Sequence, residues 1–86
     1  MPEISRFFGI VNGMFYDDHL PPHFHARHGR DRLVMAIQTK QILRGRLPPR
    51  ALRFVTGWAT MNTDSLMDNW RRAERHEPLI SIPPLE

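Results

Sequence analysis

The sequence predicts an α+β fold: a small, mainly antiparallel sheet of about four strands in the N-terminal half, packed by two C-terminal helices. The first half is rich in β-branched and aromatic residues separated by turn signals. After Pro48-Pro49, apolar residues recur at three- and four-residue steps instead. A length of 86 residues predicts a single domain spanning 1–86, since compact domains typically run about 50–250 residues.

The first strands are expected within Ile4–Tyr16, where the apolar residues are interrupted by Gly9 and by Asn12-Gly13. An Asn-Gly pair between apolar runs is the strongest short-range signal for a two-residue hairpin. A turn at Gly9 is the alternative and would leave a longer second strand, so the register stays open. Asp17–Pro22 is expected to form a loop that Pro21-Pro22 holds extended. The remaining strands are expected at His23–His28, Arg32–Gln38 and Gln41–Arg46.

Two helices are expected in the second half. Pro48 and Pro49 open the first one, because a proline costs no hydrogen bond in the first turn. Its apolar face is expected to comprise Ala51, Phe54, Val55, Trp58 and Met61. The apolar stripe of the second helix comprises Leu66, Met67, Trp70 and Ala73. Asp68 and Arg72 form an exposed i,i+4 pair on it, and the tail Leu79–Glu86 is expected to pack back onto the domain.

Composition excludes several classes of protein. The absence of cysteine excludes a disulfide framework, a thiolate zinc finger and a cysteine nucleophile. No signal peptide and no run of about 20 apolar residues is visible, so we expect a cytoplasmic protein without membrane contact. The net charge is +3, and eleven of the twelve cationic side chains are arginines. This bias suits an acidic or nucleic-acid partner, although the arginines could equally serve only to solubilise the surface.

The histidines are concentrated in one segment, at His19, His23, His25 and His28. On a strand, His23 and His25 project from the same face, and His28 faces away from them. Such a pair can bind a divalent metal such as zinc, with Asp18 and His19 as further ligands. It can also supply a general acid and base without any cofactor. A purely structural role for the imidazoles is the third alternative.

Arginines flank this segment and suggest an anion site. The anion-binding candidates are Arg30, Arg32, Arg46 and Arg50. The last two lie near a helix start, where free N–H groups also favour anions. The catalytic candidates are His23, His25 and Arg27. Together these residue types suit metal-free RNA cleavage, in which imidazoles move protons and arginine stabilises the phosphate.

No aromatic platform for stacking bases is expected, which counts against sequence-specific RNA recognition. The aromatic residues of the first half are assigned to the core: Phe7, Phe8, Phe15 and Tyr16. Nucleotide-binding loops, a His-Glu-x-x-His helix and a serine-centred elbow are also absent.

The chain resembles a bacterial family of short proteins classed as a domain of unknown function. The segments that carry the resemblance are Met1–Ile10, Asp17–His19, Pro21–Ala26, Gly45–Leu52, Asn69-Trp70 and Pro84–Glu86. Pro-Pro-His-Phe-His is the most particular of them, and it makes Pro22, His23 and His25 the characteristic positions. The resemblance implies a partner, a second small protein encoded alongside, in an arrangement that looks like a toxin–antitoxin pair.

Three functions are therefore expected as alternatives. The first is a small metal-independent ribonuclease toxin that uses the paired histidines and arginines. The second is a non-catalytic module that binds and regulates its cognate partner, and the third is a histidine-based divalent-metal protein. Homodimerisation through a sheet edge, at Gln41–Arg46 or the tail, is compatible with each of them.

Overall fold

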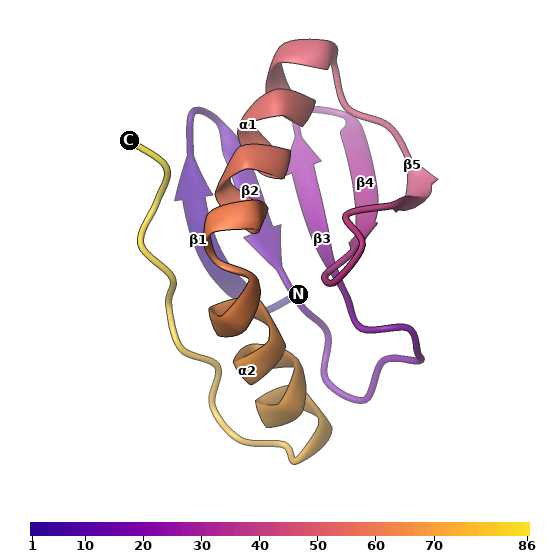
Figure 1. Ribbon diagram of the computed structural model, residues 1–86, viewed down its shortest axis with the longest axis vertical. Coiled ribbons are helices and arrows are strands. Elements are labelled where there is room, and N and C mark those ends of the chain that lie inside the picture. The colour runs from indigo at the N-terminus through magenta and orange to yellow at the C-terminus, as the bar shows by residue number, and fades with distance from the viewer.

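The computed structural model describes residues 1–86 and confirms the α+β prediction. A five-stranded antiparallel sheet, with strands in the order of the chain, is followed by two helices (Figure 1). The elements are β1 (Glu3–Phe7), β2 (Ile10–Gly13), β3 (His23–His28), β4 (Asp31–Ala36), β5 (Ile42–Gly45), α1 (Pro49–Met61) and α2 (Thr63–Glu74). The sheet thus has five strands where about four were predicted.

The first hairpin turns at Phe8-Gly9, the alternative that the sequence left open, and not at Asn12-Gly13. Both turn residues have positive φ angles, 49° and 75°, and Phe7 pairs with Ile10 across the turn. Asn12-Gly13 instead lies inside β2. A side chain at Gly13 would overlap the carbonyl oxygen of Pro2, which accepts a hydrogen bond from the Met14 backbone N–H at 3.1 Å. Glycine is therefore needed at position 13 because the backbone of Pro2 passes close to it, and not because the chain turns there.

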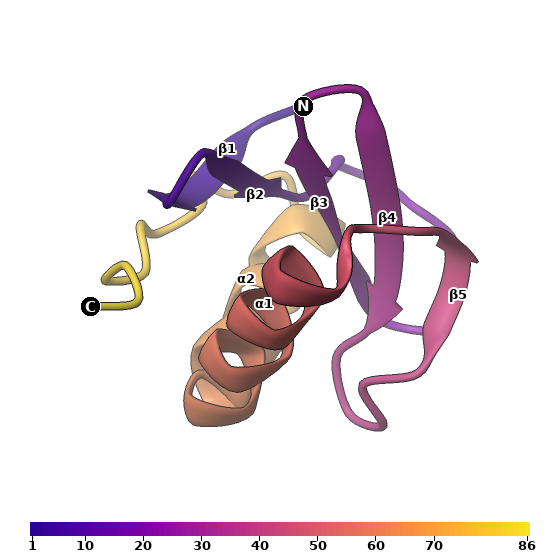
Figure 2. The ribbon, with the colours of Figure 1, turned by 90° about the horizontal axis from the view of Figure 1, so that it is seen from above.

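Both helices cover the same face of the curved sheet (Figure 2). Alternation along β3 and β4 sends Phe24, Ala26, Leu33 and Met35 into a common core with Trp58 of α1. No helix covers the opposite face, which we call the open face. Because the two faces alternate residue by residue, the fold fixes which side chains of β3 and β4 remain available to a ligand.

The helices follow the predicted pattern with one correction. α1 begins at Pro49, as expected, and buries Ala51, Val55 and Trp58. Met61 was expected on the same apolar face but is 68% exposed. In the last turn the buried position is Ala59, and this turns Met61 toward solvent. Neither helix is long and apolar enough to cross a membrane.

The tail packs onto the domain, as predicted. Asn69 of α2 fixes its start, because the Asn69 amide exchanges two hydrogen bonds of 2.8 Å with the backbone of Ile80. Further along, buried Ile82 donates its backbone N–H to the Ile4 carbonyl of β1 at 2.8 Å. The tail therefore runs along the β1 edge of the sheet (Figure 1).

Candidate functional site

The loop before β3 folds back over the start of that strand and brings Asp18 to the histidine pair. Asp18 Oδ2 lies 2.9 Å from His23 Nε2 and 3.4 Å from His25 Nε2. One ligand atom from each of the three side chains lies within 4.8 Å of the others, so the group could hold a metal ion. We call Asp18, His23 and His25 the Asp-His-His cluster.

His23 is the buried member of the cluster. Its side chain is only 3% exposed, and its ring lies against that of Trp70 of α2, with centroids 5.1 Å apart. The second ring nitrogen, Nδ1, is 2.7 Å from the carbonyl oxygen of Pro21. Because a carbonyl only accepts hydrogen bonds, Nδ1 must carry a proton. In the neutral ring, the lone pair of Nε2 then points at the Asp18 carboxylate.

His25 is the accessible member. It pairs with Val34 across β3 and β4, and its ring is nearly perpendicular to that of Phe15, with centroids 4.9 Å apart. Burial lowers the pKa of His25, and the charges of His23, when that ring is protonated, and of Arg44 lower it further. The Asp18 carboxylate opposes these effects without compensating for them. His25 therefore stays neutral to a lower pH than a free histidine.

Asp18 is held as a carboxylate. Burial alone would raise the pKa of Asp18, but the backbone N–H of His19 and the rings of His23 and His25 outweigh that effect. The resulting pKa lies below the usual range of aspartate. A negative carboxylate beside two imidazoles is the protonation state that a metal ion requires of these ligands.

The remaining histidines lie outside the cluster. His19, predicted as a ligand, is 80% exposed and contacts the other carboxylate oxygen of Asp18 at 3.0 Å. His28 lines a separate pocket with Phe54 of α1, on the helix side of the sheet as strand parity predicted. The His76 side chain pairs with Asp17 at 2.8 Å.

The predicted arginine set does not form one site. Arg32 faces the open face, whereas Arg50 lies over the Phe54 ring at 5.5 Å on the helix side. Arg30 lies in the exposed turn between β3 and β4, and Arg46 follows β5. Among the predicted residues, only Arg27 and Arg32 share a pocket with His25.

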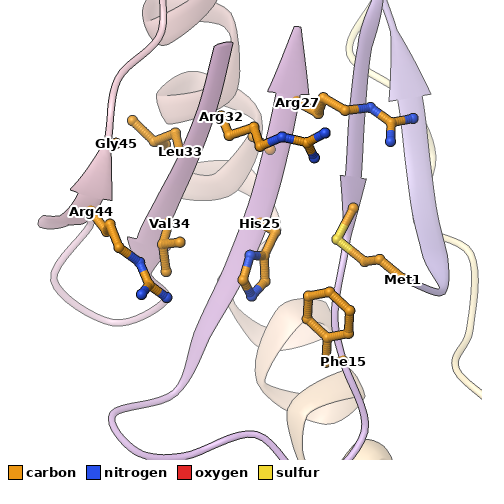
Figure 3. Close-up of a pocket in the computed structure, with 10 residues that line it drawn as sticks. Met1, Phe15, His25, Arg27, Arg32, Leu33, Val34, Arg44 and Gly45 are labelled. Atoms are coloured by element: carbon orange, nitrogen blue, oxygen red, sulfur yellow. The ribbon is translucent and has the colours of Figure 1, made fainter. Parts of the chain in front are cut away.

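That pocket occupies the open face and has a volume of about 460 Å³. Figure 3 shows His25 between Phe15 and Val34, with Arg44 on the β5 side and Arg27 and Arg32 extending toward β2 and β1. We call it the open-face pocket, and its lining residues are Met1, Phe15, His25, Ala26, Arg27, Arg32, Leu33, Val34, Arg44 and Gly45. The Asp-His-His cluster and the open-face pocket therefore share His25.

Three of the four aromatic residues that were assigned to the core are exposed in the structure. Phe7 is buried, but Phe8 is 55% exposed in its tight turn, Phe15 is 44% exposed and Tyr16 is exposed as well. Phe15 and Tyr16 follow the end of β2, where strand alternation no longer directs them into the core. Sequence reasoning missed Phe15 for this reason, since its apolar character indicated burial.

Fold and cluster together define a small α+β protein with a carboxylate–imidazole centre beside an arginine-rich pocket. Residues 9–71 match the model of the Domain of unknown function family DUF4160, and the chain belongs to this family. The matched region contains the whole Asp-His-His cluster and the pocket arginines. Comparisons with curated proteins and with solved structures find no match.

Proposed function

We propose that the Asp-His-His cluster binds a divalent transition-metal ion with one or more coordination positions left open. The observation that carries this proposal is the contact between His23 and Asp18. Nε2 of His23 and Oδ2 of Asp18 are 2.9 Å apart, while the only proton of the neutral ring is donated to Pro21. Two lone pairs at this distance repel unless a cation, a proton or a metal ion, lies between them.

The types of ligand, their spacing and the hydrogen bond of His23 to Pro21 favour a metal ion over a proton. Nitrogen ligands of tetrahedral zinc lie about 3.3 Å from one another, given bonds of about 2.0–2.1 Å. The two contacts of Asp18, 2.9 and 3.4 Å, bracket this spacing, and all three ligand atoms lie within 4.8 Å of one another. Metal-binding histidines commonly donate their other N–H to a backbone carbonyl, as His23 does toward Pro21. Two imidazoles and one carboxylate suit Zn²⁺ or Fe²⁺ and leave room for water or substrate.

Calorimetric titration of the metal-free chain with Zn²⁺ tests the proposal. We expect one ion per chain and at least a tenfold loss of affinity in Asp18→Asn, which keeps the shape of the side chain but removes its charge. His28→Ala is the matched control, because His28 lies on the same strand but faces the helix side. Equal zinc affinity in Asp18→Asn and the wild type would contradict the proposal.

A metal-independent ribonuclease toxin, acting with a cognate partner in a toxin–antitoxin-like pair, is the second candidate function. The observation that favours it is the position of His25, whose ring opens onto a pocket with Arg27 and Arg32. Against it, His23 is buried and both of its ring nitrogens are occupied. Only one imidazole can then exchange protons freely with a substrate.

Expression of the chain alone in a bacterial host separates the two candidates. Growth arrest and RNA loss that disappear in His25→Ala, together with RNA digestion in vitro that survives EDTA, would support the metal-free nuclease. Digestion that EDTA abolishes and Zn²⁺ or Fe²⁺ restores would support a functional metal centre instead.

A further inference from the structure

Three arginines on the open face have no acidic partner. Arg27, Arg32 and Arg44 make no ion pair, although all three line the open-face pocket. The acidic side chains that do form ion pairs contact other groups: Glu3 pairs with Arg6, and the acidic groups of α2 and its C-terminus pair with Arg72 and Arg75.

Two of these arginines lie directly opposite each other. Arg27 of β3 and Arg32 of β4 are cross-strand partners in the antiparallel register. Like charges in this position destabilise a sheet. Glu3, the acidic group that feels the charge of Arg27, forms its hydrogen-bonded ion pair with Arg6 instead. Arg44 of β5 lies opposite Val34 of β4, and Val34 in turn lies opposite His25 of β3. Figure 3 shows the guanidinium groups of Arg27 and Arg32 on the same side of the pocket, toward β2 and β1, and that of Arg44 apart from them beside Val34. The paired guanidinium groups of Arg27 and Arg32 suit a phosphate group, which arginine binds through paired hydrogen bonds.

Besides the arginines and His25, the pocket has apolar side chains, and one of them is an aromatic ring that a planar ligand could stack on. Val34 belongs to its lining, and Phe15 stands at one side with 44% of its surface exposed. The volume of about 460 Å³ falls within the range of small-ligand pockets. Aromatic side chains beside a cationic groove are the arrangement that binds unpaired bases together with their phosphates.

We infer that the open-face pocket binds a nucleotide unit, with its phosphate on Arg27 and Arg32, its base against Phe15, and Arg44 adding positive charge on the β5 side. The unit can be a free nucleotide or part of a single strand, since the pocket chemistry is the same for both. A duplex keeps its bases stacked and presents none to Phe15. The phosphate site does not require a metal. Only its placement beside a metal ion at His25 rests on the proposed function.

Fluorescence anisotropy with a labelled eight-nucleotide RNA tests this inference. We expect the wild type to bind the RNA and Arg27→Ala/Arg32→Ala to bind it at least tenfold more weakly. Arg53→Ala/Arg71→Ala is the matched control, since it removes the same charge from exposed positions on the helices and should change affinity less than threefold. Phe15→Leu should weaken binding about tenfold through lost stacking. Thermal melting checks that each variant is folded.

Competition experiments identify the source of the ligand. Displacement by a nucleoside monophosphate would indicate a free nucleotide, whereas displacement only by unlabelled RNA or DNA single strands would indicate a strand. Either result supports the inference. No binding by the wild type, equal competition by duplex RNA, or equal losses in the two double-arginine variants would overturn it.

Failure of this inference is distinguishable from failure of the metal proposal. Asp18→Asn should lose zinc affinity and keep RNA affinity measured in EDTA, because Asp18 does not line the pocket. Arg27→Ala/Arg32→Ala should show the opposite behaviour, with zinc binding retained. A metal site that fails in calorimetry therefore leaves the anisotropy result intact.

Discussion

Ser5 of β1 and Asn12 of β2 lie opposite each other in the first hairpin, and neither side chain forms a hydrogen bond with a protein group. Both are buried. A buried polar group without a partner costs about 1–3 kcal/mol of stability. This pair is therefore a local weakness in a sheet that is otherwise well paired.

Replacing Asn12 with valine should stabilise the protein. The change removes the unpaired amide and introduces a β-branched residue suited to a strand, so the free energy of unfolding should rise by about 1 kcal/mol. Urea denaturation followed by circular dichroism measures it. Ser5→Ala is the matched control and should have a smaller effect of the same sign. A loss of stability in Asn12→Val would show that the amide makes a contact essential to the fold.

The attachment of the tail to Asn69 should contribute measurably to stability. Asn69→Ala removes two hydrogen bonds of 2.8 Å to Ile80, so the free energy of unfolding should fall by about 2 kcal/mol. Limited proteolysis should then cleave Leu79–Glu86 faster than in the wild type. Asp68→Ala, next in sequence, breaks only a partly exposed ion pair with Arg72 and should cost under about 1 kcal/mol. Unchanged proteolysis in Asn69→Ala would contradict this role.

The metal-free protein should lose stability in two stages as the pH falls. The folded pKa of His25 is lowered, so the unfolded chain takes up a proton more readily, and stability declines as the pH drops from about 6.5 toward the folded value. Asp18 also has a lowered pKa. Its stabilisation is present above about pH 3.9 and is lost as the pH falls through the lower folded value.

Urea denaturation of the metal-free wild type and of His25→Asn between pH 7 and pH 3 measures both stages. The variant should lack the first stage and keep the second. A wild type whose stability is constant between pH 6.5 and pH 5 would contradict the placement of His25.

The histidines around Asp18 should contribute unequally to zinc affinity. His25→Ala removes a ligand and should weaken binding at least a hundredfold. His19→Ala should weaken it by about tenfold or less, the low end for groups that only orient a metal ligand, because the His19 ring is exposed and touches the outer oxygen of Asp18. Competition with a coloured zinc chelator measures both. Comparable losses in the two variants would instead make His19 a fourth ligand.

Periodicity and turn chemistry were sufficient to predict the fold class, both helices, the packed tail and the strand that carries the histidines. They did not choose between Gly9 and Asn12-Gly13, since both sites have turn-forming residues and local preference cannot detect the contact between Gly13 and Pro2. The prediction that Met61 lies on the apolar face was wrong for a similar reason, because helical spacing alone does not show which residue of the last turn meets the core.

The site was predictable only along one strand. Alternation brought His23 and His25 to one face. Asp18 and His19 were both candidates to join them, and the loop conformation, which the sequence does not specify, brings Asp18 to the pair and leaves His19 exposed. Arg44 reaches the open-face pocket through an irregular register between β4 and β5, where Val34 pairs with Arg44 and Met35 with Ile42. An irregularity of this kind changes which side chains share a face, and nothing in the local sequence predicts it.

The covered β1 edge also limits how the molecule can assemble. Since the tail runs along β1, β5 is the edge strand that keeps backbone groups free for another chain. Two copies joined through β5 would form one continuous sheet whose outer edges are both capped by tails. Growth by strand addition would then terminate at the pair and could not continue into a filament.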